Sequence, residues 1–143
     1  MRRLLPLLAL VTLLGSIGAP TRARAQQAPV DSLAVGRTFT RWFYTGKGDS
    51  VFARLAPKMR EKMPNPDAVN RQYQAVTGAA GDEDSVIREE ITPREAGGFI
   101  YRRTAKFKKV SIPFQLIWTV MPDGMVDGLL IGTEQMLRNA QIR

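Results

Sequence analysis

The chain of 143 residues contains neither cysteine nor histidine. Without cysteine it has no disulfide, no thiol nucleophile and no thiolate ligand for a metal. Without histidine a Ser-His-Asp triad is also excluded, as is a zinc site of the Cys/His type. The acid–base chemistry that remains is that of carboxylates, tyrosine and lysine, and we expect neither a metal nor a cofactor.

Acidic residues are missing from the N-terminal region, where residues 1–25 hold four of the 21 Lys and Arg but none of the 13 Asp and Glu. Arg2-Arg3 precedes an apolar run from residue 4 to about residue 19, and Ala23-Arg24-Ala25 supplies a small-x-small sequence. This is the pattern of a secretory signal peptide cleaved before Gln26. Prolines and glycines interrupt the run, which is too short for a spanning helix. We therefore expect a periplasmic or secreted protein without stable membrane insertion.

Removal of residues 1–25 leaves 118 residues with a formal charge of +4 instead of +8, because four cations leave with the signal. That length suffices for one compact domain and not for two. A charge of +4 is ordinary, so the composition gives no support to a nucleic-acid partner. The predicted organisation is a flexible lead-in over 26–31, a single domain over 32–132 and a C-terminal tail over 133–143 that forms a short helix or frays.

The first half of the chain has the spacing of short amphipathic helices. Asp31-Ser32 is a capping signal, after which apolar side chains recur at helical intervals from Leu33 to Phe43 until two glycines follow. TGKGDS at 45–50 lacks the upstream glycine and the hydroxyl directly after lysine that a phosphate loop requires, so it predicts a link between helices. Further helices are predicted over residues 49–55, 58–63 and 67–76, followed by a loose segment.

The second half changes to the period of β-strands. Alternating or β-branched and aromatic-rich stretches cover residues 85–93, 98–108, 111–121 and 125–132. Helices followed by four such strands predict an α+β fold, with the helices packed on one face of an antiparallel meander.

Asp123-Gly124 is the strongest hairpin signal in the chain and predicts a two-residue turn. On that register Val120 faces Asp127 and Trp118 faces Leu129. The predicted inner face contains Ile112, Phe114, Leu116, Trp118, Val120, Leu129 and Ile131. The opposite face is also apolar, with Ile117, Met121, Val126 and Leu130. Two apolar faces indicate a sheet that is covered on both sides. The helices would cover the inner face, and a homodimer would cover the outer face.

FIYRRTAKFKKV, residues 99–110, combines five cations with three aromatic side chains. On a strand, the aromatic residues and Arg103 share one face, whereas Arg102, Lys106, Lys108 and Lys109 lie on the other face or at the end. This separation argues against a nucleic-acid interface, in which bases stack on aromatic residues beside the cations.

Glu89 is the polar residue between Ile87 and Ile91 on the presumed apolar face of the first strand. A buried carboxylate requires a partner. The connecting turn places Glu89 opposite Arg103 and Ile91 opposite Tyr101. We therefore predict a Glu89–Arg103 ion pair on the inner face of the sheet.

Two segments resemble a known family: FTRWFYTGKGDSVFARLAPKM and YRRTAKFKKVSIPFQLIWTVMPDGMVDGLLI. They are similar to small exported bacterial domains of the cystatin-like, nuclear-transport-factor-2-like superfamily, which occur alone or beside serine hydrolases. The resemblance covers about residues 32–132 and is most specific in the final hairpin. It implies a cone, in which a curved sheet wraps helices around a pocket at its open end. Some relatives are isomerases or dehydratases with an aspartate base and a Tyr or His that polarises a carbonyl.

The leading hypothesis is a non-catalytic exported domain that binds a small ligand or a partner protein. The predicted ligand-binding residues are Arg103, Tyr101, Phe114 and Trp118. The alternative is an enzyme of isomerase or hydratase type, with Asp127 or Glu89 as base and Tyr101 as hydrogen-bond donor. A third possibility is an accessory module of a separate serine hydrolase.

Overall fold

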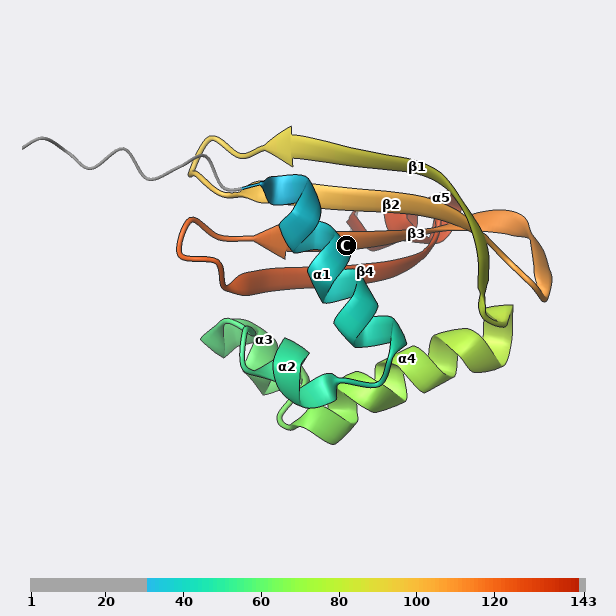
Figure 1. Ribbon diagram of the computed structural model, residues 1–143, viewed down its shortest axis with the longest axis horizontal. Coiled ribbons are helices and arrows are strands. Elements are labelled where there is room, and N and C mark those ends of the chain that lie inside the picture. The colour runs from blue at the N-terminus through green and yellow to red at the C-terminus, as the bar shows by residue number, and fades with distance from the viewer. Residues whose placement is uncertain (1–30, 142–143) are drawn as a thin grey trace, which may run out of the picture.

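The computed structural model describes residues 31–141, so the predicted signal peptide and residues 26–30 of the lead-in lie outside the described part. The helices are α1 (Ser32–Tyr44), α2 (Gly48–Phe52), α3 (Pro57–Lys62), α4 (Pro66–Ala80) and α5 (Glu134–Gln141). The strands are β1 (Glu83–Pro93), β2 (Phe99–Phe107), β3 (Val110–Val120) and β4 (Val126–Thr133). Figure 1 shows these elements along the chain. The predicted α+β class is confirmed. Within residues 31–141 no helix has both the length and the apolar character needed to cross a bilayer.

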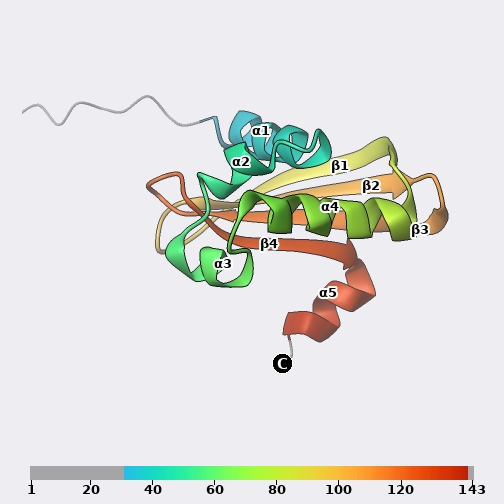
Figure 2. The same cartoon turned by 90° about the horizontal axis from the view of Figure 1, so that it is seen from below.

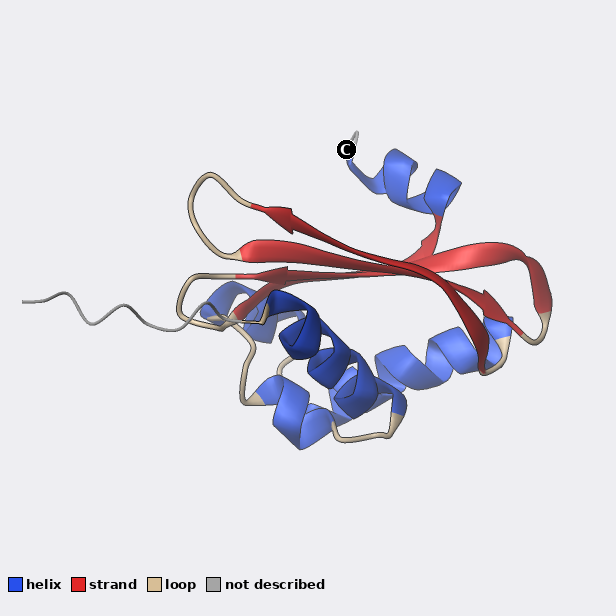
Figure 3. Cartoon of the chain, turned by 45° about the horizontal axis from the view of Figure 1, so that its top comes forward, coloured by secondary structure: helices blue, strands red, loops and turns tan. Residues whose placement is uncertain are grey.

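The four strands form one open antiparallel sheet in the order β1-β2-β3-β4. Helices α1 to α4 lie on one face of this sheet and α5 lies on the other (Figures 2 and 3). The sheet is therefore the middle of three layers. The C-terminal tail, for which the sequence left helix and frayed chain open, contains α5, and Leu137 of this helix is buried.

Helix α1 begins at a defined cap and buries a narrow stripe. The Asp31 side chain accepts a hydrogen bond from the Ala34 backbone N–H at 3.0 Å, which satisfies one free donor of the first turn. The buried residues are Gly36, Phe39, Thr40 and Phe43. Their spacing of three and four places them on one side of the helix, which faces the sheet.

Helix α4 is longer than the sequence pattern predicts. The Asn65 side chain caps its start, and the helix runs past the expected end at Val76 to Ala80. The prediction of a loose segment was therefore wrong for residues 77–80, which are helical. Val76 and Ala80 lie one turn apart and are both buried in a cluster with Phe107, so packing on the sheet extends the helix.

The predicted register of β1 and β2 is confirmed, because Glu89 pairs with Arg103 and Ile91 with Tyr101. Ile87 was wrongly expected on the inner face. The register shifts between Val86 and Arg88, so Ile87 is the extra residue of a β-bulge, and it is 51% exposed.

A second irregularity affects the start of β3. The pairing of β2 with β3 shifts between Ala105 and Phe107, which leaves Ile112 in a stretch of β3 without a registered partner on β2. Ile112 was predicted to be an inner-face residue, yet it is 61% exposed. Ile112 therefore lies outside the core.

The pairing of β3 with β4 is confirmed in the body of the hairpin and differs at its tip. Trp118 pairs with Leu129 as predicted, but Val120 pairs with Val126 instead of Asp127. The cause is the turn, in which the Met121 N–H donates to the Met125 carbonyl at 2.8 Å across a three-residue connection. Such a loop ends in a left-handed residue, and Gly124 supplies it with φ of 81°.

The shift at the tip changes which side chains reach the core. Val126, predicted on the outer face, is fully buried in the main core cluster, because Asp127 is the extra residue between the two registers. On the outer face Ile117 is buried, and it shares a cavity lining with Leu137 of α5. Leu130 of that face is 39% exposed.

The main core forms where α1 crosses the sheet. Trp118 is fully buried, and its ring centroid lies 5.7 Å from Phe39 and 5.9 Å from Phe43 of α1. The Trp118 indole N–H donates to the Thr40 hydroxyl at 3.1 Å, and that hydroxyl donates to the Gly36 carbonyl at 2.9 Å. The polar atom of the largest core side chain is thereby satisfied.

Candidate functional site

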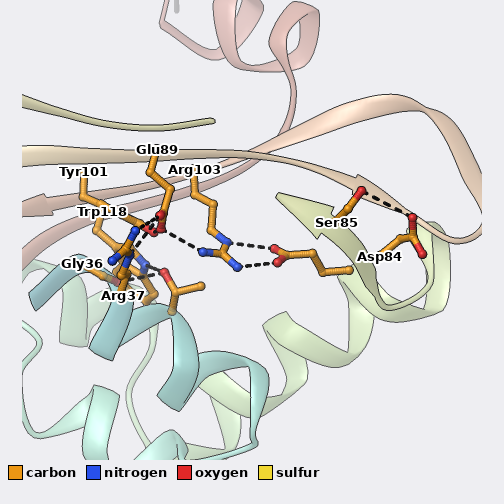
Figure 4. Close-up of polar contacts among 10 residues, drawn as sticks. Gly36, Arg37, Asp84, Ser85, Glu89, Tyr101, Arg103 and Trp118 are labelled. Atoms are coloured by element: carbon orange, nitrogen blue, oxygen red, sulfur yellow. Dashed lines mark hydrogen bonds and ion pairs between the residues drawn. The ribbon is translucent and has the colours of Figure 1, made fainter. Parts of the chain in front are cut away.

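A group of charged side chains, here called the ionic cluster, lies between α1 and the inner face of β1 and β2 (Figure 4). It consists of Arg37 from α1, Glu83 and Glu89 from β1, and Tyr101 and Arg103 from β2. Two arginines face two carboxylates, so the charges of the cluster balance.

Glu89 is the centre of the ionic cluster. One of its oxygens, Oε2, accepts hydrogen bonds from Arg37 Nε at 2.9 Å and Nη2 at 2.6 Å. The other, Oε1, accepts from the Tyr101 hydroxyl and from Arg103 Nη1 at 2.9 Å. The predicted Glu89–Arg103 ion pair is therefore confirmed, with two further donors that the sequence did not indicate.

Arg103 uses the rest of its guanidinium on Glu83. Its Nε donates to Oε2 of Glu83 at 3.1 Å and its Nη2 donates to Oε1 at 2.5 Å, which is a bidentate contact. The side chains of Arg103 and Glu83 are only 17% and 14% exposed, and that of Glu89 is 12% exposed. The guanidinium of Arg103, which was predicted to bind a ligand, thus already donates to the carboxylates of Glu83 and Glu89.

The cluster fixes the protonation states of Glu89 and Tyr101. The hydrogen bond from Arg37, opposed by burial and aided by Tyr101 and Arg103, lowers the pKa of Glu89 to about 2. Burial and the Glu89 carboxylate raise the pKa of Tyr101 to about 12. At neutral pH Glu89 is ionised and the Tyr101 hydroxyl keeps its proton. The hydroxyl can therefore donate its hydrogen bond to the Glu89 carboxylate.

Tyr101 reaches Glu89 by lying directly on the backbone of α1. A Cβ atom at Gly36 would overlap Cγ and Cδ2 of the Tyr101 ring. The absence of a side chain at Gly36 therefore sets the distance between α1 and β2. That distance also brings Arg37, the next residue, within reach of Glu89.

The other predicted ligand-binding residues do not form one accessible site. Tyr101 and Trp118 are paired across β2 and β3, and both are fully buried. Phe114 lies in a second cluster, where its ring centroid is 5.5 Å from that of Phe107. In this conformation α1 separates Tyr101 and Trp118 from solvent.

Asp127, the other base of the enzyme hypothesis, does not join Glu89 and Tyr101. It is the partly exposed extra residue near the tip of β4, whereas Glu89 lies on β1 at the opposite edge of the sheet. Three strand spacings of about 4.8 Å separate these two strands, or about 14 Å in all. The two carboxylates therefore do not share one site.

Arg37 and Glu83 were missed by the sequence reasoning. Glu83 lies in GDED, a composition that is typical of a loop, but β1 already begins at this residue. Arg37 lies on a helix whose apolar stripe was recognised, at the edge of that stripe and next to Gly36. A glycine inside an amphipathic helix is the one signal that indicates a close approach by another element at this point.

An apolar concavity lies on the exposed side of α1, at the end of the sheet where the hairpin tips meet. One cavity of about 310 Å³ adjoins another of about 570 Å³, since Val35 and Gly124 line both. We call the combined surface the α1–hairpin groove. Its further lining residues are Ser32, Ala34, Thr38, Phe39, Trp42, Arg54, Gly98, Phe99, Val120, Met121, Pro122 and Asp123.

Within residues 31–141 no group of three or more Asp or Glu side chains is placed to hold a metal ion. Comparisons with protein-family models, curated proteins and solved structures gave no match for this chain. The geometry of the ionic cluster and of the α1–hairpin groove therefore carries the functional assignment.

The low pKa of Glu89 predicts an acid-sensitive contribution to stability. The folded-state pKa of about 2 lies below the ordinary value of 4.5, so the stabilisation is complete above pH 4.5 and is lost as the pH falls toward 2. Between pH 5 and pH 3 we expect this residue to account for a loss of about 2 kcal/mol in the free energy of unfolding.

Urea unfolding of the wild type and of Glu89→Gln at both pH values measures this contribution. The amide has no proton to gain, so the variant should lose about 2 kcal/mol less than the wild type over the same interval. Equal losses in the two proteins would show that Glu89 titrates at its ordinary pKa.

Proposed function

We propose that this chain is an exported, non-catalytic domain of the cystatin-like, nuclear-transport-factor-2-like superfamily that binds a small amphipathic molecule in the α1–hairpin groove. The α+β architecture, with four helices on one face of an antiparallel meander, supports the superfamily. The N-terminal signal pattern supports export. The observation that carries the binding role is the groove itself, an apolar concavity at the edge of the main core.

The groove has the lining of a site for an apolar body. Val35, Phe39 and Trp42 lie on consecutive turns of α1 and together form one wall, with the Phe39 and Trp42 rings in edge-to-face contact at 5.7 Å. Trp42 is only partly buried, although a tryptophan side chain gains most when it is covered. A ligand that covers Trp42 therefore removes apolar surface from water.

Two charged side chains line the groove: Arg54 lies in the cavity that Trp42 lines, and Asp123 lies in the adjoining cavity. The Arg54 side chain is exposed and lines the groove. Within residues 31–141 its guanidinium forms no hydrogen bond or ion pair. The hydrogen bonds of Arg54 are made by its backbone N–H and carbonyl. A ligand with a hydrophobic body and one acidic group would cover Trp42 and face Arg54 at the same time.

The ionic cluster supports a role without catalysis. A general base at neutral pH works best with a pKa near 7, and Glu89 is held far below that value. The hydroxyl of Tyr101, the donor of the enzyme hypothesis, is directed at Glu89 itself. The two groups stabilise each other beneath α1, where the fully buried Tyr101 ring offers no surface to a substrate.

Binding of 1-anilinonaphthalene-8-sulfonate tests the proposal, because this probe combines an apolar body with one sulfonate. We expect it to bind the folded protein with energy transfer from Trp42. Val35→Asp should weaken binding at least tenfold by placing a charge in the apolar wall. Arg54→Gln should weaken the sulfonate probe about fivefold and leave the uncharged N-phenyl-1-naphthylamine unaffected, as the loss of one exposed charge contact predicts.

Val86→Asp is the matched control, because it places the same charge on an exposed valine of β1 that does not line the groove. Its affinity for the probe should equal that of the wild type. The proposal fails if the folded protein does not bind the probe, or if Val35→Asp and Val86→Asp bind it equally well. Arg54→Gln changes an exposed side chain, so it reports on the groove even if Val35→Asp does not fold.

A further inference from the structure

A polar cavity of about 190 Å³ lies on the other side of the sheet, between its outer face and α5. We call it the α5 pocket. Strands β1 to β3 supply Arg88, Arg102, Gln115 and Ile117, and α5 supplies Glu134, Leu137 and Arg138. Figure 3 shows α5 on the side of the sheet away from α1, so the α5 pocket and the α1–hairpin groove are separated by the sheet.

The cations of the α5 pocket are not all compensated. Arg88 pairs with Glu90 at 3.1 Å, and Arg138 pairs with Glu134 at 3.2 Å. In the described part of the chain the Arg102 side chain forms no hydrogen bond or ion pair, and its Nε atom is buried without a partner. Glu90 is the cross-strand neighbour of Arg102 but its ion pair is with Arg88, so three arginines of the pocket face two carboxylates.

A second unsatisfied atom lies next to Arg102. Thr104 Oγ1 is also buried without a partner, and Thr104 lies two residues along β2 from Arg102 on the same face of the sheet. Gln115, which lines the pocket, pairs with Thr104 across β2 and β3. Arg102 and Gln115 thus supply donors to the cavity, and Ile117 and Leu137, both buried, supply apolar lining.

We propose that the α5 pocket binds a short-chain monocarboxylate, with the carboxylate on Arg102 and the alkyl chain against Ile117 and Leu137. A guanidinium offers two parallel N–H groups that match the two oxygens of a carboxylate. The Gln115 amide can donate to the same group. A cavity of about 190 Å³ corresponds to about six water molecules at roughly 30 Å³ each, which suits a molecule of four to six heavy atoms.

The number of free charges selects a monoanion over a dianion. Glu90 and Glu134 already neutralise Arg88 and Arg138, so one positive charge remains for the ligand. A phosphate dianion would bring a second negative charge close to Glu134, which lines the same pocket. Like charges at such distances repel.

Calorimetric titration of the purified protein with butyrate tests this assignment. We expect saturable millimolar binding of butyrate and at least tenfold weaker binding of inorganic phosphate. Arg102→Gln should lower the butyrate affinity at least tenfold. Arg102→Lys should lower it less, because the charge remains while the paired N–H groups are lost.

Arg71→Gln is the matched control, because it removes an exposed arginine of α4 that lines neither the α5 pocket nor the α1–hairpin groove. Butyrate affinity should not change in this variant. The inference is overturned if butyrate does not bind, if phosphate binds as tightly, or if Arg54→Gln reduces binding and Arg102→Gln does not. The last result would assign butyrate to the groove, so the two proposals fail separately.

Thermal unfolding distinguishes a loss of butyrate binding from a folding defect in the variants. Saturating butyrate should raise the midpoint of the wild type and of Arg71→Gln, because a ligand of the folded state stabilises it. The same concentration should leave the midpoint of Arg102→Gln unchanged. A shift of equal size in all three proteins would contradict binding at Arg102.

Discussion

Replacement of Arg103 by methionine is expected to lower the free energy of unfolding by about 3 kcal/mol. The change leaves Glu83 without its bidentate partner and removes one donor from Glu89, and both carboxylates are less than 15% exposed. A carboxylate that is buried without its partner is costly, whereas methionine fills much of the same volume. Urea unfolding at neutral pH measures the difference.

Two further variants show whether the destabilisation by Arg103→Met comes from lost charge compensation or from lost packing. Arg88→Met removes an arginine from an exposed ion pair with Glu90, in which the side chains are 59% and 41% exposed, and should cost no more than about 0.5 kcal/mol. Adding Glu83→Gln and Glu89→Gln to Arg103→Met should restore more than half of the lost stability. Equal losses in the two single arginine variants would show that the ionic cluster is solvated like a surface pair.

Alanine at Gly36 is expected to destabilise the protein by about 2 kcal/mol, although alanine is the better helix former by about 1 kcal/mol. The added Cβ would overlap the Tyr101 ring, so α1 and β2 must move apart. We expect the pKa of Glu89 to rise toward its ordinary value in this variant, because Arg37 and Tyr101 would no longer both reach it. Carboxyl chemical shifts followed against pH measure that change.

Gly78→Ala is the matched control on another helix. A Cβ at Gly78 of α4 would meet no atom within 4 Å, so the same substitution should stabilise the protein by about 0.5 kcal/mol. The two glycine variants should therefore change stability in opposite directions. If both stabilise the protein, the contact between Gly36 and Tyr101 does not limit the packing of α1.

The pairing of the ionic cluster could be predicted where the strand period is regular. Glu89 interrupts an apolar face and Arg103 interrupts an aromatic one, so a single register brings both together, and the structure has that register. The partners from other elements could not be found in this way. Arg37 reaches Glu89 from a separate helix, and the angle at which a helix crosses a sheet is set by packing that no periodicity encodes.

The bulges explain most of the wrong expectations. Strict alternation places Ile87 inside and Val126 outside, and one extra residue in each strand reverses both. At the hairpin tip the signal Asp123-Gly124 identified the turn correctly but not its length. The Asp123 carboxylate accepts from the Met125 N–H at 2.9 Å, which favours the three-residue loop over the two-residue turn.

The hydrogen bond between Thr40 and Trp118 joins residues 78 positions apart, and the contact between Arg37 and Glu89 spans 52. At a synthesis rate of about 5 to 20 residues per second, α1 waits about 4 to 16 seconds before β3 is made. During that interval the apolar stripe of α1 has no sheet to cover, so the main core cannot form. The export that we propose needs an unfolded chain, and this order of elements delays the main core until β3 has been synthesised.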